Sequence, residues 1–293
     1  MELMDKASSG TALTLEEAAR VLASPDLIDV GTLAEAARRA RSGDRVTYGR
    51  VAVVSTLETA IECGEAGEVR IAIALESADE ACRIAAEVSK AAAGRVVTGF
   101  SLGDLLALVG GDHLALAEVA RALRASGLEA VAELPLDRLG DTENAIEVVR
   151  AVAHGGLGTW RATVTQARLD ERLTLIARAD ELQRATGALR AFAPLPRVDP
   201  ADTPSTGYDD VHTVAVARLV CAGIPRIQVD WPLYGPKLAQ VAIAYGADDI
   251  DGVAAVDTLQ LGHRRSPRED IERQIRAAGA APVERDGRYA DRP

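Results

Sequence analysis

Short apolar segments alternate with longer segments of helical periodicity along most of the chain. Runs rich in valine, isoleucine and alanine, bounded by glycine or polar residues, predict β-strands. Eight strands are predicted, over 45–54, 68–75, 94–100, 128–134, 158–165, 188–195, 224–230 and 247–253. Strands that alternate with helices are typical of a parallel sheet built from βα units.

Between the strands, apolar residues recur at the spacing of one helix face, which predicts amphipathic helices. These helices are expected over 56–67, 77–93, 112–127, 141–156, 169–187, 208–223 and 235–246. Eight strands with helices between them favour an α/β fold of the TIM type, a (β/α)8 barrel. An open, doubly wound sheet is the alternative, because a linear pattern cannot show whether a sheet closes into a ring.

Helical patterns also flank the predicted barrel at both ends. Two precede the first strand, over 14–24 and 26–43, and the first of them opens with a capping box at Thr14. A further helix is predicted over 266–279, with Ser266 as its cap. The barrel is therefore expected to carry N-terminal helices and a C-terminal helical extension.

No interior segment is rich in proline, glycine or serine, so no linker divides the chain. We predict a single barrel domain over 1–293. Within it, 1–44 forms the N-terminal tail and helices, 45–253 the barrel core, and 254–293 the C-terminal helix and tail.

The composition and charge of the chain limit the kinds of partner that the protein can bind. The 293 residues are 48% hydrophobic, enough to bury a substantial core, and the formal net charge of -11 argues against a nucleic-acid-binding surface. No apolar run approaches the roughly 20 residues that cross a bilayer. Residues 1–10 also lack the basic and apolar regions of a signal peptide. We therefore expect a cytoplasmic protein without a membrane span.

The cysteines and histidines show no metal-site spacing. Cys63, Cys82 and Cys221 are odd in number and widely separated, which favours reduced core thiols over a disulfide framework. The four histidines are scattered as well. No metal site is predicted.

Carboxylates dominate the positions expected at the mouth of the barrel. In (β/α)8 barrels the active site forms where the strands present their C-terminal residues. Glu76, Glu133 and Asp230 lie there and are the catalytic candidates, because such groups can act as acid and base or hold a divalent cation. The competing interpretation is that they cap the helices that follow.

The segment 228–252 concentrates further candidates. Its prolines stiffen a loop that carries tryptophan and tyrosine, and such loops often supply a stacking wall for a flat ligand. The predicted ligand-binding residues are Trp231, Tyr234, Lys237, Asp249 and Asp251. The alternatives are that Trp231 packs the top layer of the barrel and that Asp251 serves a turn.

Several segments resemble successive landmarks of one group of radical SAM enzymes. They include "VVRAVAHGGLGTWRATVT" (148–165), "ERLTLIARADELQRATGALRAFAPLP" (171–196) and "IRAAGAAPVERDGRY" (275–289). The most specific lies within 213–252 and contains "IPRIQVDWPLYGPKLAQVAIAYGADDIDG". The group contains aminofutalosine synthase and dehypoxanthine futalosine cyclase of menaquinone synthesis, together with the deazaflavin (FO) synthase subunits.

This resemblance implies a radical SAM barrel, with a [4Fe–4S] cluster held by a CxxxCxxC loop after the first strand. Here that strand ends in "VVST", and Ser55 to Glu58 predicts a capping box that starts a helix at once. The family's Gly-Gly turn for adenosylmethionine is replaced by "ALES" at 74–77. Neither the cluster nor S-adenosylmethionine is therefore expected as a cofactor.

Three hypotheses follow. The first is a cluster-less homologue, a pseudoenzyme candidate that binds a futalosine-like or other flat aromatic small molecule or assists a catalytic paralogue. Its partners would be that ligand and a menaquinone-pathway protein or a second copy of the chain. The second is a non-radical enzyme that uses the acidic mouth for acid–base or metal-assisted chemistry. The third is a radical SAM enzyme with unusual cluster ligands.

Overall fold

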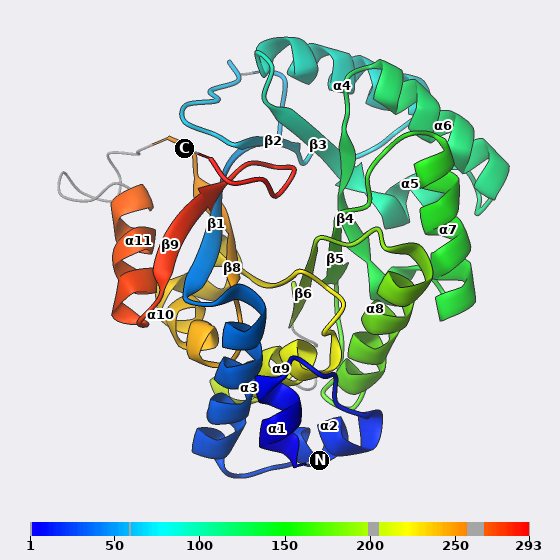
Figure 1. Ribbon diagram of the computed structural model, residues 1–293. Coiled ribbons are helices and arrows are strands. Elements are labelled where there is room, and N and C mark those ends of the chain that lie inside the picture. The colour runs from blue at the N-terminus through cyan, green and yellow to red at the C-terminus, as the bar shows by residue number, and fades with distance from the viewer. Residues whose placement is uncertain (1, 59, 199–204, 257–266, 293) are drawn as a thin grey trace.

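Eight parallel strands close into a barrel. The structure, a computed structural model, describes residues 2–58, 60–198, 205–256 and 267–292. The strands are β1 (Arg45–Val54), β2 (Glu68–Ile71), β3 (Val96–Ser101), β4 (Ala130–Pro135), β5 (Arg161–Val164), β6 (Ala191–Pro196), β7 (Arg226–Asp230) and β8 (Asp249–Ala254). Each pairs with the next, and β1 pairs with both β8 and β2, which closes the ring (Figure 1). The predicted (β/α)8 barrel is confirmed, and the open-sheet alternative is wrong.

Helices surround the ring. They are α4 (Ala78–Ala91), α5 (Leu102–Leu108), α6 (His113–Ala125), α7 (Thr142–His154), α8 (Arg172–Thr186), α9 (Gly207–Val220) and α10 (Trp231–Ala244), with a 3-10 turn η1 (Leu136–Arg138). Their apolar faces pack on the outside of the strands, because parallel strands are covered by the helices that connect them. None of the described helices is long and apolar enough to cross a membrane. The cytoplasmic location stays a prediction.

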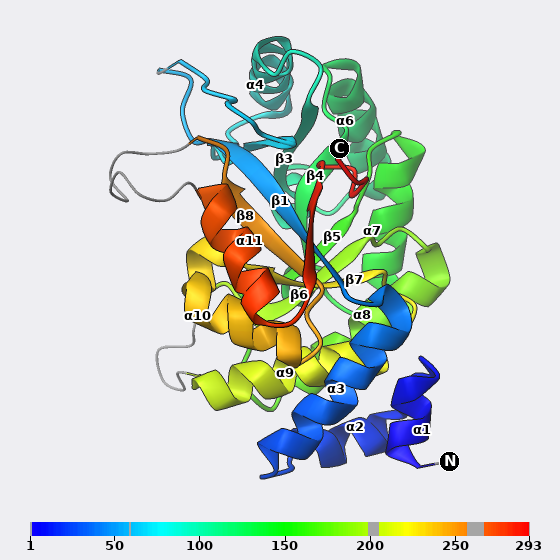
Figure 2. The same ribbon diagram turned by 60° about the vertical axis from the view of Figure 1, so that its left-hand side comes forward.

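The helices at the two ends pack on the same barrel. Those before β1 are α1 (Leu3–Ser8), α2 (Leu15–Leu22) and α3 (Leu27–Ser42), and the last is α11 (Pro267–Ala277). The capping box of α2 is confirmed, since the Thr14 side chain and Glu17 exchange hydrogen bonds with each other's backbone N–H. Ser266 lies outside the described residues. Figure 2 shows α11 beside β1 and β8, and α3 near the start of β1. That the whole chain forms a single domain stays a prediction.

The predicted helix over 56–67 is wrong. The part of this segment that the structure describes forms an irregular loop, and the Glu58 N–H bonds to Thr56 Oγ1 at 3.1 Å in a local turn. Gly64 comes so close to β8 that a Cβ there would lie 2.6 Å from the Ala255 carbonyl oxygen. The loop is therefore held by backbone contacts with the barrel, which override the local helix signal.

The strand that follows this loop is also shorter than predicted. β2 ends at Ile71, whereas the pattern extended it over 68–75. Cys63 accordingly lies in the loop and not on a helix, although it is buried as expected. Cys221 is buried and Cys82 is partly buried on α4.

A ninth strand was not predicted. β9 (Ala281–Arg285) pairs in parallel with the first half of β1, from Arg45 opposite Ala281 to Gly49 opposite Arg285. The tail after β9 then turns toward the centre of the ring (Figure 1). Gly49 is required here, because a Cβ at that position would lie 2.7 Å from Nη1 of Arg285.

Arg285 enters an ion-pair network inside the barrel. Its guanidinium donates from Nε to Oδ1 of Asp249 at 2.6 Å and from Nη2 to Oδ1 of Asp251 at 3.0 Å. All three side chains are fully buried, and the guanidinium lies 4.1 Å from the ring centroid of Tyr289. The C-terminal segment thus supplies a positive charge for two acids of β8.

Two further arginines complete the network. Arg70 donates from Nη1 to Oδ2 of Asp251 at 2.8 Å, and Arg161 pairs with the same oxygen. Glu68 in turn accepts from Nε of Arg70 at 2.8 Å and from the Thr98 hydroxyl at 2.6 Å. Charges from β2, β5, β8 and β9 therefore compensate one another in the interior.

Removing Arg285 should destabilise the fold strongly. We expect Arg285→Met to lower the free energy of unfolding by about 3–5 kcal/mol, because it leaves buried carboxylates without their partner. Urea unfolding measures this as a lower midpoint at unchanged slope. The control is Arg288→Met, whose ion pair with Glu129 involves an arginine side chain that is 48% exposed. It should cost about 0–1 kcal/mol. Equal losses in the two variants would contradict a central role for Arg285.

Candidate functional site

Three charged side chains meet at the mouth of the barrel, where the strands end. Arg197, just after β6, lies 3.3 Å by Nε from Oε2 of Glu133 on β4. Its Nη2 lies 3.5 Å from Oδ2 of Asp230 at the end of β7. Asp230 also accepts the Leu233 N–H at 3.3 Å and so caps α10. Glu133, Arg197 and Asp230, called the mouth triad below, bring together two of the three predicted catalytic candidates.

The interior network below the mouth sets the electrostatics of the triad. Asp230 is only 7% exposed, and burial, with the charge of Asp251 added, raises its pKa against the opposing effect of Arg197. Burial also lowers the pKa of Arg197, helped by the positive charge of Arg161. Asp251 behaves in the opposite way: burial acts to raise its pKa, but three neighbouring arginines outweigh burial and hold it well below the usual range. Asp230 therefore keeps its proton to a higher pH than Asp251 does.

Asp249 and Asp251 lie deeper than the sequence suggested. Both are 0% exposed. Asp249 accepts from Arg285, from the Thr47 hydroxyl and from the Gln228 amide, and Asp251 from arginines. The carboxylates of both residues therefore contact side chains of the interior network. A role of either residue in ligand binding stays a prediction.

The remaining predicted residues are spread around the rim. Trp231 is partly buried against the core at the first position of α10, and the Tyr234 hydroxyl donates to the Pro196 carbonyl. Lys237 is exposed, beyond a break in α10 at Gly235. Glu76 is exposed as well, in the bend before α4, and it is not a member of the ion pairs that form the mouth triad.

A groove opens beside the triad. It has a volume of about 520 Å³ and lies between the ends of β1 and β8 and the loop after β1. Its lining is mostly apolar, with Ser55, Thr56 and Glu62 as the polar side chains: Val51, Ala52, Val53, Val54, Ser55, Thr56, Ala60, Ile61, Glu62, Gly252, Ala254, Ala255 and Val256. Gly252, one of these lining residues, lies next to the triad, since a Cβ on it would be 3.5 Å from Oδ1 of Asp230, whereas the three triad residues are not part of the lining.

The apolar wall of this groove is accessible to a ligand. Val53 is 59% exposed although it belongs to a central strand. It lies on the same face of β1 as Thr47 and Gly49, which contact the interior residues Asp249 and Arg285. Val53 and Ile61 were not among the predicted site residues. Ile61 was expected on a helix after β1, and Val53 was expected within a buried strand. Arg197 was expected at a strand end of the mouth, because it directly follows an apolar strand, but it was not chosen as a site residue.

The residues of this region do not fit a [4Fe–4S] cluster. Such a cluster takes thiolate ligands, and the loop 55–67 contains one cysteine. Its sulfur is buried and lies 3.7 Å from the Ala91 carbonyl oxygen, toward α4. Cys221 is remote in sequence, and burial raises the pKa of its thiol far above the ordinary value. Within the described ranges, no three His, Cys, Asp or Glu side chains come together in a way that could hold a metal ion.

Comparison with known proteins finds sequence similarity to two kinds of biosynthetic enzyme. No family model matches it. It is 30% identical over 209 residues to the 5-amino-6-(D-ribitylamino)uracil–L-tyrosine 4-hydroxyphenyl transferase 2 of Methanosarcina mazei, covering 60% of this chain and 54% of that protein. It is also 30% identical over 203 residues to the aminodeoxyfutalosine synthase of Thermus thermophilus, covering 59% and 54%. The chain is a homologue of these enzymes.

These homologues are the relatives that the sequence resemblance indicated, from deazaflavin and futalosine-route menaquinone synthesis. The chain spans about half the length of the curated relatives it matches. A crystal structure of methylornithine synthase (PylB) superposes with a TM-score of 0.70 at 12% identity over 96% of this chain and 97% of that one. The two chains therefore share the barrel fold over nearly their whole length.

The raised pKa of Asp230 predicts a pH-dependent stability. Since the pKa is higher in the folded protein than in the unfolded chain, the stability it contributes is present below the ordinary aspartate value of about 3.9. That contribution is lost as the pH rises through the raised value. Asp230→Asn keeps a side chain that can cap α10 but cannot ionise. Its free energy of unfolding should therefore rise relative to the wild type as the pH increases above the ordinary aspartate value.

Urea unfolding at a series of pH values measures this difference. Asp112→Asn, at the exposed cap of α6, is the matched control for loss of a capping carboxylate. A constant difference between wild type and Asp230→Asn across the series would show that Asp230 does not retain its proton.

Proposed function

We propose that the protein binds a small molecule with a flat ring and a hydroxylated chain in the groove at the barrel mouth, without a radical SAM cluster. The observation that carries this proposal is the groove of about 520 Å³, which has an apolar wall and includes Gly252, a neighbour of Asp230 in the mouth triad. Such a volume lies within the range of about 300–1,000 Å³ typical of ligand pockets. The work of the protein would be binding, either alone or in support of a catalytic relative.

The apolar wall suits the flat part of such a ligand. Val53 and Ile61, with neighbouring alanines, offer a surface from which a ring can displace water. Burial of apolar surface contributes roughly 25 cal/mol per Å². Because the interior below the mouth is filled by paired charges, a ligand is confined to the rim and the groove.

The mouth triad suits the polar part. Glu133 and Asp230 offer acceptors, and Arg197 between them offers donors, which together match hydroxyl groups. The names of the homologues include a ribitylaminouracil and a deoxyfutalosine, and the first of these is a ring that bears a hydroxylated chain. We propose ligands of that class for this chain, within menaquinone or deazaflavin synthesis.

The absence of a cluster motif is the basis for a binding role without radical chemistry. The one cysteine of the loop after β1 is buried toward α4, and the sequence offers no CxxxCxxC motif. A catalytic relative of the same pathway, or a second copy of this chain, would be its protein partner.

A second candidate function is acid–base catalysis at the same mouth. The observation in its favour is the raised pKa of Asp230 beside Glu133 and Arg197, since a retained proton can be delivered to a bound substrate. Asp230→Asn would abolish such an activity while leaving binding largely intact, which separates this candidate from the first.

Binding should depend on the apolar wall. We expect the wild-type protein to bind 5-amino-6-(D-ribitylamino)uracil or aminodeoxyfutalosine in calorimetric titrations. Val53→Arg should weaken that binding at least about tenfold, because it places a charge in the groove. The matched control is Val241→Arg, at a valine that is 47% exposed on α10 and does not line the groove. Equal affinities of the two variants, or no binding of either compound to the wild type, would refute the groove as the site.

Anaerobic reconstitution with iron and sulfide tests the cluster. We expect the wild-type protein to retain no more iron than Cys63→Ser and to show no iron–sulfur absorption, because one thiolate cannot hold the cluster. Stoichiometric iron in the wild type that is lost in Cys63→Ser would instead favour a radical SAM enzyme with unusual ligands.

A further inference from the structure

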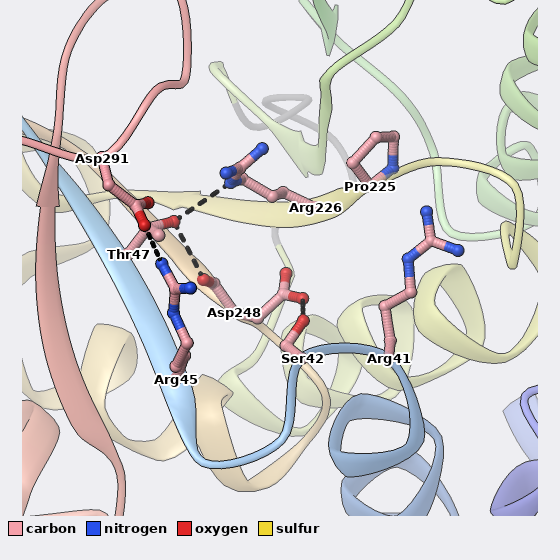
Figure 3. A pocket seen from close by; sticks show the side chains of 8 residues that line it. All are labelled: Arg41, Ser42, Arg45, Thr47, Pro225, Arg226, Asp248 and Asp291. Atoms are coloured by element: carbon pink, nitrogen blue, oxygen red, sulfur yellow. Dashed lines mark hydrogen bonds and ion pairs between the residues drawn. The ribbon is translucent and has the colours of Figure 1, made fainter.

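A second cavity lies at the opposite end of the barrel from the mouth. It has a volume of about 310 Å³ and is formed by the end of α3, the start of β1, the start of β7, the residue before β8 and the C-terminal tail (Figure 3). In (β/α)8 barrels the active site lies at the mouth, and residues at the opposite end normally serve stability. A cavity with charged side chains at this end therefore calls for another explanation.

Three guanidinium groups line this cavity. Figure 3 shows Arg41 and Arg45 on opposite sides of it, with Arg226 near the loop of Pro225. Arg41 and Arg45 come from the neighbouring elements α3 and β1, and Arg226 comes from β7, far away in sequence. Such a gathering stands out in a chain whose formal net charge is -11.

The two carboxylates of the lining are already neutralised. Asp248 pairs with the buried Arg218 behind the cavity wall, and it also accepts from the Ser42 hydroxyl and the Ile227 N–H. Asp291 pairs with Arg45. Neither carboxylate of the lining therefore neutralises Arg41 or Arg226, the other two arginines that line the cavity.

Those two arginines have neutral partners. Arg41 donates from Nη1 to the Ala222 carbonyl oxygen at 3.0 Å. Arg226 donates from Nη2 to the Tyr289 carbonyl oxygen at 3.0 Å and from Nε to the Thr47 hydroxyl at 3.3 Å. Among the residues that the structure describes, neither forms an ion pair with a carboxylate, so each guanidinium keeps donors and a full charge for an anion.

We propose that this cavity binds a phosphate group, either free or carried by a small metabolite. Arginine presents paired N–H donors that match the oxygens of a phosphate, and two uncompensated guanidinium groups supply the charge. The Ser42 and Thr47 hydroxyls lie in the same lining. This site is separate from the groove at the mouth and does not depend on the function proposed there.

Calorimetric titration of the wild-type protein with inorganic phosphate and with ribose 5-phosphate tests the proposal. We expect saturable one-site binding of at least one of them with a Kd of about 1 mM or below, weakened by added salt. Tighter binding of ribose 5-phosphate indicates a phosphorylated metabolite, and equal or tighter binding of inorganic phosphate indicates the free ion. No saturable binding of either would overturn the proposal.

Two substitutions locate the site. Arg41→Ala should weaken binding about tenfold, since it removes one charged donor group. Arg41 is exposed, and its side chain donates a hydrogen bond to the Ala222 carbonyl oxygen. Circular dichroism of the variant should therefore show an unchanged fold. Arg150→Ala, on the exposed side of α7, is the control and should bind as the wild type does.

A further variant separates this site from the mouth. Val53→Arg should retain phosphate binding, because Val53 lines the groove and not this cavity. If Arg41→Ala binds as tightly as the wild type, or if Arg150→Ala weakens binding as much as Arg41→Ala, the assignment to this cavity is wrong.

Discussion

Mutual compensation of charges inside the barrel is the constraint on which the rest of this structure depends. Barrels of this type are usually filled by layers of branched apolar side chains. Here Asp249 and Asp251 of β8 are fully buried and face Arg70, Arg161 and Arg285. Taking a charge out of water costs several kcal/mol, so each group is tolerated only with its partners in place. Strands far apart in the sequence are thereby bound to one another by charge.

The C-terminal segment becomes part of the barrel for the same reason. Arg285 arrives on β9, next to Gly49, and contacts both buried acids of β8. Tyr289 follows it into the interior, where its hydroxyl accepts from the Gln228 amide at 3.3 Å. The last residues of the chain thus complete an interior whose other parts come from β1, β7 and β8.

The same network shapes both ends of the molecule. Toward the mouth, the charge of Asp251 adds to burial in raising the pKa of Asp230. The interior network therefore increases the proton affinity of one member of the mouth triad. Toward the opposite end, Thr47 links the network to the second cavity, since it donates to Asp249 and accepts from Arg226. The interior is filled by these paired charges, and the two larger cavities described above lie at the ends of the barrel.

Local pattern was a good guide to the elements themselves. The alternation of apolar strands and amphipathic helices predicted the eight-stranded barrel, because burial on both faces leaves a continuous apolar run in each strand. Glu133 and Asp230 were expected at the mouth because parallel strands end at the same edge. The capping box at Thr14 was found because it needs contacts within one turn.

Tertiary contacts decided the rest. The capping signal at Ser55 gave way to a loop, because Gly64 and its neighbours are held against β8. β9 forms because the first half of β1 offers a free edge, which no short-range pattern reveals. Arg70 and Asp251 are 181 residues apart, and only the closed ring brings them together. The sequence by itself determined the strands, most of the helices and two residues of the mouth triad, because those depend on neighbours along the chain. The partners of the buried charges, the groove and the second cavity depend on neighbours in space, and only the fold could decide them.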